Sequence, residues 1–246
     1  MEQFQYLNAV RRVMDHLGST QAPAIDAAAD LVCEALTNKQ AVFCADIGHG
    51  IQGDFVNRAG GLAAVRAFSY GFTLNDAVAE CLKDRPRRVP VERDLETVRL
   101  AVRCSNLRAG DVMLIGSVSG RNRVPVELAL ACNEMGVRVV GLTSMEYTRA
   151  VESLHPSGRK LCDVSDVVID IGAPFGDAAV EIPGLEVPVL PVSGVAFALC
   201  GWMLWERTMQ KMIAVGKPPT VFMSVNRPGG EDHYKRSLQR YDEVGY

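Results

Sequence analysis

The segment Ser117-Val118-Ser119-Gly120-Arg121-Asn122 combines the kinds of groups that hold an anion. Its two serine hydroxyls are two residues apart, its glycine permits close approach of the backbone, and its asparagine adds an amide. An apolar run, residues 111–116, precedes it, and a helix is expected to begin near Val124. Because a helix N-terminus offers unpaired N–H groups and a partial positive charge, this arrangement predicts a phosphate cradle that needs no lysine. Serine, glycine and asparagine are also ordinary turn and N-cap residues, so the segment alone leaves both interpretations open.

Two other apolar runs end in residues that suit the same site. Residues 40–45 are followed by Asp46-Ile47-Gly48-His49-Gly50, and residues 137–142 are followed by Thr143-Ser144. Ligands of parallel α/β sheets bind outside the carboxyl ends of the strands, so these residues are expected beside the serine segment. Arg121 is either a bidentate partner for phosphate or a solvated residue at a helix start. Three such strand ends favour one ligand site over three unrelated turns.

Short apolar runs alternate with helical patterns along most of the chain. The spacing of apolar residues predicts helices over 2–17, 23–36, 75–82, 124–135 and 192–215, with Gly18-Ser19-Thr20 ending the first helix. Strands are expected over 40–45, 111–116, 137–142 and 164–171, with a fifth near 187–190. This alternation indicates a parallel sheet covered by helices on both faces, and no repeat or linker divides the chain.

Bulk composition narrows the function classes. The 246 residues carry a formal net charge of −3, so neither a nucleic-acid partner nor a membrane surface is expected. The N-terminal residues lack a secretory pattern, and the longest apolar stretch is too short and glycine-broken to span a bilayer. Seven cysteines without a CxxC pair suit buried thiols in a reducing cytoplasm, which predicts a cytoplasmic protein.

No cofactor or metal is expected. Residues 48–53 have the GxGxxG spacing, but no acidic residue ends a second strand about twenty residues later, as a dinucleotide site requires. His49, His155, Asp177 and Glu181 are the side chains that could form a metal site, but the sequence has neither HExxH nor an i,i+4 histidine pair.

Beyond the serine segment, the chain resembles the SIS (sugar isomerase) domain superfamily, whose phosphosugar loop has the pattern S-x-S-G-x-[ST]. The resemblance covers roughly residues 1–235. Within the superfamily, the chain is similar to the branch labelled phosphoheptose-isomerase-like. The segments that carry it are Gly48-His49, residues 58–62, 117–127, Thr143-Ser144, 157–164 and 176–182.

The resemblance implies a flavodoxin-like three-layer α/β/α sandwich with a five-stranded parallel sheet. It implies one SIS domain over 1–246, with N-terminal helices in 1–38, the α/β core in 39–215 and a C-terminal tail in 216–246. It also implies a sugar-phosphate ligand and a homodimer or homotetramer.

The first loop departs from the branch, which usually has Gly-Thr-Gly-His-Ser where this chain has Asp46–Gly50. One hydroxyl is lost and one carboxylate is gained. Asp46 repels a phosphate unless it binds a sugar hydroxyl or pairs with Arg121 or Arg58, so the departure bears on the substrate more than on the fold. Asn122 replaces the usual Ser or Thr, a change that is common in this branch.

Aldose–ketose isomerisation needs a base that moves a proton between C1 and C2 and a group that opens the ring. Glu181, after the loop 172–176, is the first choice for the base, with a solvated surface carboxylate as the alternative. His49 is the acid/base candidate, with a helix-capping histidine as the alternative, and His155 lies before another loop. Asn226, in the glycine-rich tail, is expected to reach sugar hydroxyls.

The hypothesis is therefore a sugar-phosphate-binding protein that acts as an aldose–ketose isomerase. Two alternatives stay open: a phosphosugar sensor without turnover, and a lyase or hydrolase acting on an amino-sugar phosphate, because one fold hosts several chemistries.

Overall fold

The computed structural model describes residues 4–49, 51–86 and 92–246. The helices are α1 (Gln5–Thr20), α2 (Ala22–Thr37), α3 (Gln52–Phe55), α4 (Arg93–Cys104), α5 (Arg123–Glu134), α6 (Met145–Ala150), α7 (Ser193–Ala214) and α8 (Gly230–Val244). The strands are β1 (Val42–Gly48), β2 (Val65–Phe68), β3 (Val112–Gly116), β4 (Arg138–Thr143), β5 (Val167–Asp170), β6 (Ala178–Val180) and β7 (Val189–Pro191). Short 3-10 turns span Glu80–Leu82 and Leu161–Asp163.

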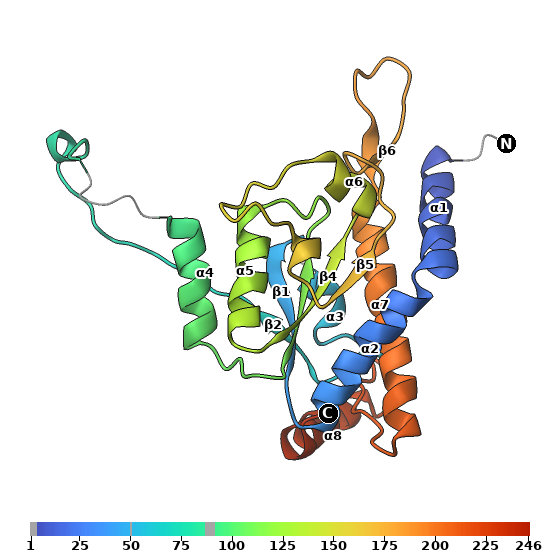
Figure 1. Cartoon of the computed structure of the whole chain (residues 1–246). Coiled ribbons are helices and arrows are strands. Elements are labelled where there is room, and N and C mark those ends of the chain that lie inside the picture. Colours follow the sequence, from blue (N-terminus) through green and yellow to red (C-terminus); the bar gives the residue numbers. More distant parts are fainter. Residues whose placement is uncertain (1–3, 50, 87–91) are drawn as a thin grey trace.

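Five parallel strands form the central sheet in the order β2-β1-β3-β4-β5. This is the flavodoxin-like order, which confirms the predicted fold class. The central strand β3 is buried along its whole length, as expected for a sheet covered on both faces. Helices α1, α2, α3 and α7 pack on one face, while α4 and α5 cover the other, so two apolar cores lie on either side of the sheet (Figure 1).

The prediction for the fifth strand was wrong. Val189–Pro191 forms β7, which pairs antiparallel with β6 in a separate hairpin, and the sheet's fifth strand is β2. At four residues, with one exposed and one half-buried position, β2 has too little apolar alternation to stand out in the sequence. The hairpin residues look strand-like in sequence because they are apolar, yet most of them are exposed.

Several helix predictions also need correction. The predicted helix over 75–82 is only the turn Glu80–Leu82, and the polar helices α4 and α8 were missed. Helix α1 continues through Gly18 to Thr20 because the hydroxyls of Ser19 and Thr20 donate to the carbonyls of Asp15 and His16, at 2.5 and 2.7 Å. Short polar side chains at a helix end can thus bond backward into the preceding turn.

One glycine sets how closely α7 approaches α3. The Phe55 ring lies against Gly201, with Trp202 and Trp205 edge-on at 5.8 and 6.0 Å between ring centroids. A Cβ atom at Gly201 would overlap the Phe55 ring, which is 1% exposed and enclosed by the core.

We therefore expect Gly201→Ala to lower the free energy of unfolding by about 1–3 kcal/mol through overpacking, despite the better helix propensity of alanine. Gly194→Ala in the same helix is the control, because nothing lies within 4 Å of a Cβ there. Urea denaturation of both variants measures the difference. Equal stability of the two variants would contradict the packing described.

Candidate functional site

The serine segment forms a tight loop between β3 and α5. The Ser117 N–H donates to the Leu142 carbonyl at 3.0 Å, and the Gly120 N–H donates to the Ser117 carbonyl at 3.1 Å. Gly120 has φ +63°, and a Cβ there would lie 2.9 Å from Thr143 Oγ1 and 3.0 Å from Thr148 Oγ1. Both the backbone angle and the lack of space therefore require glycine at this position.

Hydroxyls from β4 and α6 hold this loop from behind. Thr143 Oγ1 donates to the Val118 carbonyl at 3.1 Å and lies 3.0 Å from Thr148 Oγ1, which donates to the Ser119 carbonyl at 3.0 Å. Ser144 Oγ donates to the Ala173 carbonyl at 2.5 Å and accepts the Tyr147 N–H as the cap of α6. Thr143 and Ser144 are thus fully buried and bonded within the chain, where they shape the loop.

Several polar groups of the loop have no hydrogen-bond partner within the described residues. No hydrogen bond within the described ranges involves Ser117 Oγ, Ser119 Oγ or the Asn122 side-chain amide, and Asn122 is the N-cap of α5. Arg121 Nε is buried without a partner in that same part of the chain. Since buried donors rarely stay unpaired, this nitrogen and the two hydroxyls suit an anion at the start of α5.

The carboxyl end of β1 lies against this loop. The register of β1 on β3 shifts between Cys44 and Gly48, and Gly48 then pairs with Gly116. Gly48 has φ +84°, and a Cβ there would overlap the Gly116 carbonyl oxygen. The His49 N–H donates to that same carbonyl at 2.9 Å, so His49 is one hydrogen bond from the residue that precedes Ser117.

Asp46 lies in the irregular part of β1 and is exposed. Bulges of this kind re-aim side chains at sheet rims. Within the described residues Asp46 forms no ion pair, so the expected pairing with Arg121 or Arg58 is not seen. Gly50, where the branch carries a hydroxyl, lies outside the described residues.

A chain of hydrogen bonds connects His49 to the start of α7. His49 Nε2 lies 3.3 Å from Ser193 Oγ, and Ser193 Oγ donates to Asp177 Oδ2 at 2.5 Å. Asp177 Oδ1 also accepts the Ser193 N–H at 2.9 Å. The His49 ring lies on Phe197, with 4.6 Å between centroids. These contacts fix one ring nitrogen of an otherwise exposed histidine.

Glu181 lies elsewhere. It is exposed just after β6 and lines a cavity of about 330 Å³ with Arg12 of α1 and Glu146 of α6. No residue of the serine segment lines this cavity. The structure therefore does not bring Glu181 together with the loop within one chain.

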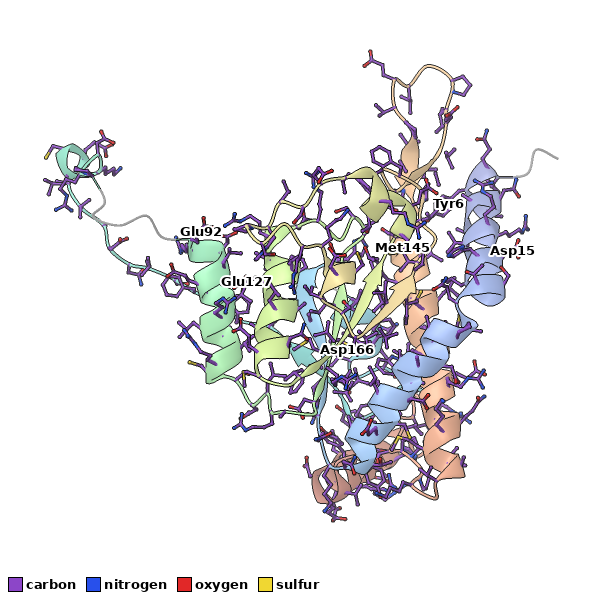
Figure 2. The ribbon with its side chains drawn as sticks, in the orientation of Figure 1. Tyr6, Asp15, Glu92, Glu127, Met145 and Asp166 are labelled. Atoms are coloured by element: carbon purple, nitrogen blue, oxygen red, sulfur yellow. The ribbon has the colours of Figure 1, made fainter. Side chains whose placement is uncertain are left out.

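His155 is 8% exposed and bonded at both ring nitrogens. Its Nε2 lies 2.7 Å from Glu127 Oε2, and its Nδ1 lies 2.8 Å from Ser157 Oγ. Glu127 also pairs with Arg99 of α4, and it lies between α4 and α5 in Figure 2. This pairing fixes residues 151–160, whose Leu154 N–H donates to the Arg121 carbonyl at 3.0 Å. His155 thus supports the serine segment indirectly, through the residues that bond to it.

Asn226 is exposed in the segment before α8. Residues 220–222 of that segment bond to residues 60–63, which precede β2. They therefore lie at the amino-terminal edge of the sheet, opposite the loop, and Figure 1 shows α8 below the sheet. Within one chain Asn226 is not brought to the site.

Sequence reasoning missed Ser193 and Thr148, and it grouped Asp177 with His49 only as possible metal ligands, not as members of one hydrogen-bond chain. A serine at a helix start and a Gly-Asp pair indicate an N-cap and a turn. Asp177 does lie in a turn, but the N-cap of α7 is Val192, and the Ser193 hydroxyl bonds to Asp177 instead of capping the helix. The positive φ of Asp177, +67°, shows that it is held in a conformation that few non-glycine residues adopt. Asp177 and His49 are connected only in the folded chain, where Ser193 at the start of α7 bonds to both.

Among the described residues, neither metal ligands nor cysteine thiols form a second candidate site. The described residues contain no cluster of three or more His, Cys, Asp or Glu side chains placed to hold a metal. All seven cysteines are free, and burial raises the pKa of the Cys132 and Cys200 thiols to about 12. Such thiols stay protonated and unreactive. In the same described ranges, no helix is long and apolar enough to cross a bilayer.

Removing the His155 side chain should leave the Glu127 carboxylate buried with Arg99 alone. We expect His155→Ala to lower the free energy of unfolding by roughly 3 kcal/mol, as for other broken buried pairs. Denaturant unfolding measures it, with His233→Ala, a partly exposed histidine near the opposite edge, as the control. A loss below about 1 kcal/mol would contradict the supporting role, since breaking a buried pair costs more.

Comparison with known proteins bears on the family and the fold. A family model described as a SIS domain matches residues 5–144, which include the serine segment. A UPF0309 protein of Caldanaerobacter subterraneus subsp. tengcongensis is 34% identical over 242 residues, covering 96% of this chain and 96% of the relative. A UPF0309 protein of Halalkalibacterium halodurans is 32% identical over 239 residues, again covering 96% of each.

Among solved structures, a phosphoheptose isomerase from Francisella tularensis has a TM-score of 0.50 and 14% identity, covering 83% of this chain and 95% of that one. A likeness at this identity shows the fold. With the family model spanning more than half of the chain, the molecule belongs to the SIS domain family, together with the UPF0309 proteins.

Proposed function

We propose that this protein binds a sugar phosphate at the carboxyl ends of β1, β3 and β4 and interconverts its aldose and ketose forms. The observation that carries the proposal is the set of loop groups that have no partner within the described residues: Ser117 Oγ, Ser119 Oγ and the buried Arg121 Nε, just before α5. Hydroxyl donors, a guanidinium nitrogen and a helix N-terminus together suit a phosphate dianion.

His49 is the proposed proton-transfer group. A serine hydroxyl has one proton, and Ser193 donates it to Asp177 at 2.5 Å, so Ser193 Oγ accepts from His49 Nε2. The neutral imidazole therefore carries its proton on Nε2 and keeps a lone pair on Nδ1. In the described part of the chain, Nδ1 has no hydrogen-bond partner, which leaves it available as a base.

The charge arrangement favours the same assignment. When His49 takes a proton from C2 of a bound sugar, it becomes an imidazolium next to a hydroxyl that Asp177 polarises. A carboxylate that holds the tautomer and stabilises the charged ring also orients the base in other base–orienter pairs. Here the carboxylate, Asp177, is half-buried and one serine lies between it and the histidine. Ser193 is 1% exposed, so water competes little for these bonds.

Glu181 is less well supported as the base than the sequence suggested. Its carboxylate shares a cavity with Arg12 and Glu146 rather than with the phosphate loop. Asp46 is exposed at the irregular part of β1 and is closer than Glu181 to His49 in the sequence. Because its carboxylate would repel a phosphate, the partner expected for it in the bound state is a sugar hydroxyl.

A thermal-shift screen of pentose, hexose, heptose and amino-sugar phosphates, followed by NMR of the stabilising ligand in D2O, tests the function. We expect stabilisation by at least one of them, with proton exchange at C2. Ser119→Ala should weaken that ligand about tenfold or more, because it removes a hydrogen bond to a charged group. Ser224→Ala, the same change near the opposite edge, should not.

Absence of stabilisation by every phosphosugar would sink the proposal. Stabilisation without exchange or product would instead support the phosphosugar sensor.

Asp177→Asn tests the role of the hydrogen-bond chain. The asparagine carbonyl still accepts the Ser193 N–H, but its NH2 group donates to Ser193 Oγ, which must then donate to His49 Nε2. The ring proton moves to Nδ1 and the base is lost, so turnover should fall by about a hundredfold or more while affinity changes little. Nitrogen-15 NMR of the ring, assigned with His49→Asn, reports the tautomer.

An unchanged His49 tautomer in Asp177→Asn would contradict the chain of bonds. Turnover that is lost in Glu181→Gln but kept in His49→Asn would return the base to Glu181.

A further inference from the structure

Residues 69–86 form an arm that leaves the body of the molecule between β2 and α4. Every residue in this range is exposed, and the only regular structure in it is the turn Glu80–Leu82. Figure 1 shows the arm extending away from the sheet and its helices, and Figure 2 shows its side chains surrounded by open space. Irregular segments of this length are uncommon in compact domains, where they usually serve as binding loops, lids or linkers.

The arm is more apolar than its exposure explains. Its large apolar side chains are Tyr70, Phe72, Leu74, Val78 and Leu82, which are 36–53% exposed. Fixing the backbone of each residue costs about 1–2 kcal/mol in entropy, which the burial of apolar side chains normally offsets. Clustered apolar side chains on a projecting segment therefore indicate a surface that another molecule covers.

Next to the base of the arm lies a groove that suits such a segment. It has a volume of about 610 Å³ and is lined by Phe72 and Leu74 from the arm base and by residues of α4, namely Arg93, Glu96, Thr97, Arg99, Leu100 and Arg103. Leu100 is 47% exposed in its floor. The Arg93 guanidinium lies over the Phe72 ring at 5.2 Å, which fixes one wall.

The charges of the groove and of the distal arm are complementary. Three arginines and one glutamate line the groove, and one of the arginines, Arg99, already pairs with Glu127 and Glu134 outside the groove lining. The distal arm, residues 75–86, carries the three carboxylates of Asp76, Glu80 and Asp84 against Lys83 and Arg85. The groove therefore keeps a slight positive charge and residues 75–86 have a slight negative charge, with apolar side chains in both; Arg87 and Arg88 follow these residues in the sequence.

We propose that the distal arm of one copy of this chain lies in the α4 groove of a second copy, and that the exchange is reciprocal about a two-fold axis. The arm base forms a wall of its own chain's groove, and the distal arm continues away from it, so the groove of another copy is the site within its reach (Figure 1). Arm and groove together supply about two dozen residues, within the roughly 20–30 per side of a stable interface.

This exchange would also steady the proposed phosphate site. Arg123, which follows the N-cap of α5, pairs with Glu92 and with Asp94 of α4, the latter at 2.6 Å. Arg99 of the groove pairs with Glu127, the partner of His155. A second copy seated on α4 therefore lies against the layer that supports the loop.

The exposed thiols of Cys81 on the arm and Cys104 at the end of α4 permit a direct test. Unlabelled and nitrogen-15-labelled chains are denatured, mixed, refolded, treated with a short bismaleimide and analysed by peptide mass spectrometry. We expect Cys81–Cys104 peptides in which about half pair a labelled with an unlabelled chain, as two-fold exchange requires. Cross-links only within chains of one label, or a monomeric wild type by analytical ultracentrifugation, would overturn the proposal.

Variants of the arm and of the groove test whether these two surfaces, and not others, hold the dimer together. Val78→Glu with Leu82→Glu places charge on the arm, and Arg103→Glu reverses charge in the groove. Each should convert the dimer to a monomer at micromolar concentration without changing the circular dichroism spectrum. Ile213→Glu, at a 62% exposed position at the end of α7, is the control that should stay dimeric. A dimer that persists in both the arm and the groove variants would contradict the exchange.

Discussion

The close approach of β1 to β3 at Gly48 and Gly116 is the constraint on which the candidate site depends. Two glycines meet where any side chain on the first would overlap the carbonyl of the second. That contact lets the His49 N–H bond to Gly116, and so it places a histidine beside the loop that begins one residue later. A wider separation of these strand ends would leave two unrelated turns instead of one candidate site.

Around this contact, each layer of the fold supports the next. Thr143 and Thr148 hold the serine loop by its carbonyls, which frees the serine hydroxyls on the other side. Asp177 and Ser193 do the same for His49, because they occupy one ring nitrogen and leave the other free. In both cases the supporting polar groups bond to the backbone or to each other, and the serine hydroxyls and His49 Nδ1 keep no partner within the described residues.

Much of this arrangement could be predicted from the sequence, for reasons visible in particular residues. The run 112–116 and the serines after it combine a continuous apolar strand with a glycine turn, and both signals are local. Helix α7 was similarly clear from its length and apolar content. The family resemblance added the sheet order, which no local pattern contains.

The missed features depend on contacts between distant segments. β2 was not recognised because its four residues become a strand only through pairing with β1. Helices α4 and α8 are polar over most of their surface, so their apolar faces are narrow. The hydrogen-bond chain from Asp177 to His49 joins positions more than a hundred residues apart, and neither end shows its partner in sequence.

Helix α8 has a consequence for solubility. β2 is an edge strand, and an open strand edge is a template for pairing with other chains. Residues 220–222 bond to the chain just before β2, and the Arg66 guanidinium of β2 lies over the Tyr241 ring of α8 at 4.5 Å. The polar C-terminal segment therefore shields the exposed side of the sheet, and a shortened protein that lacked it would tend to aggregate through that edge before its site was affected.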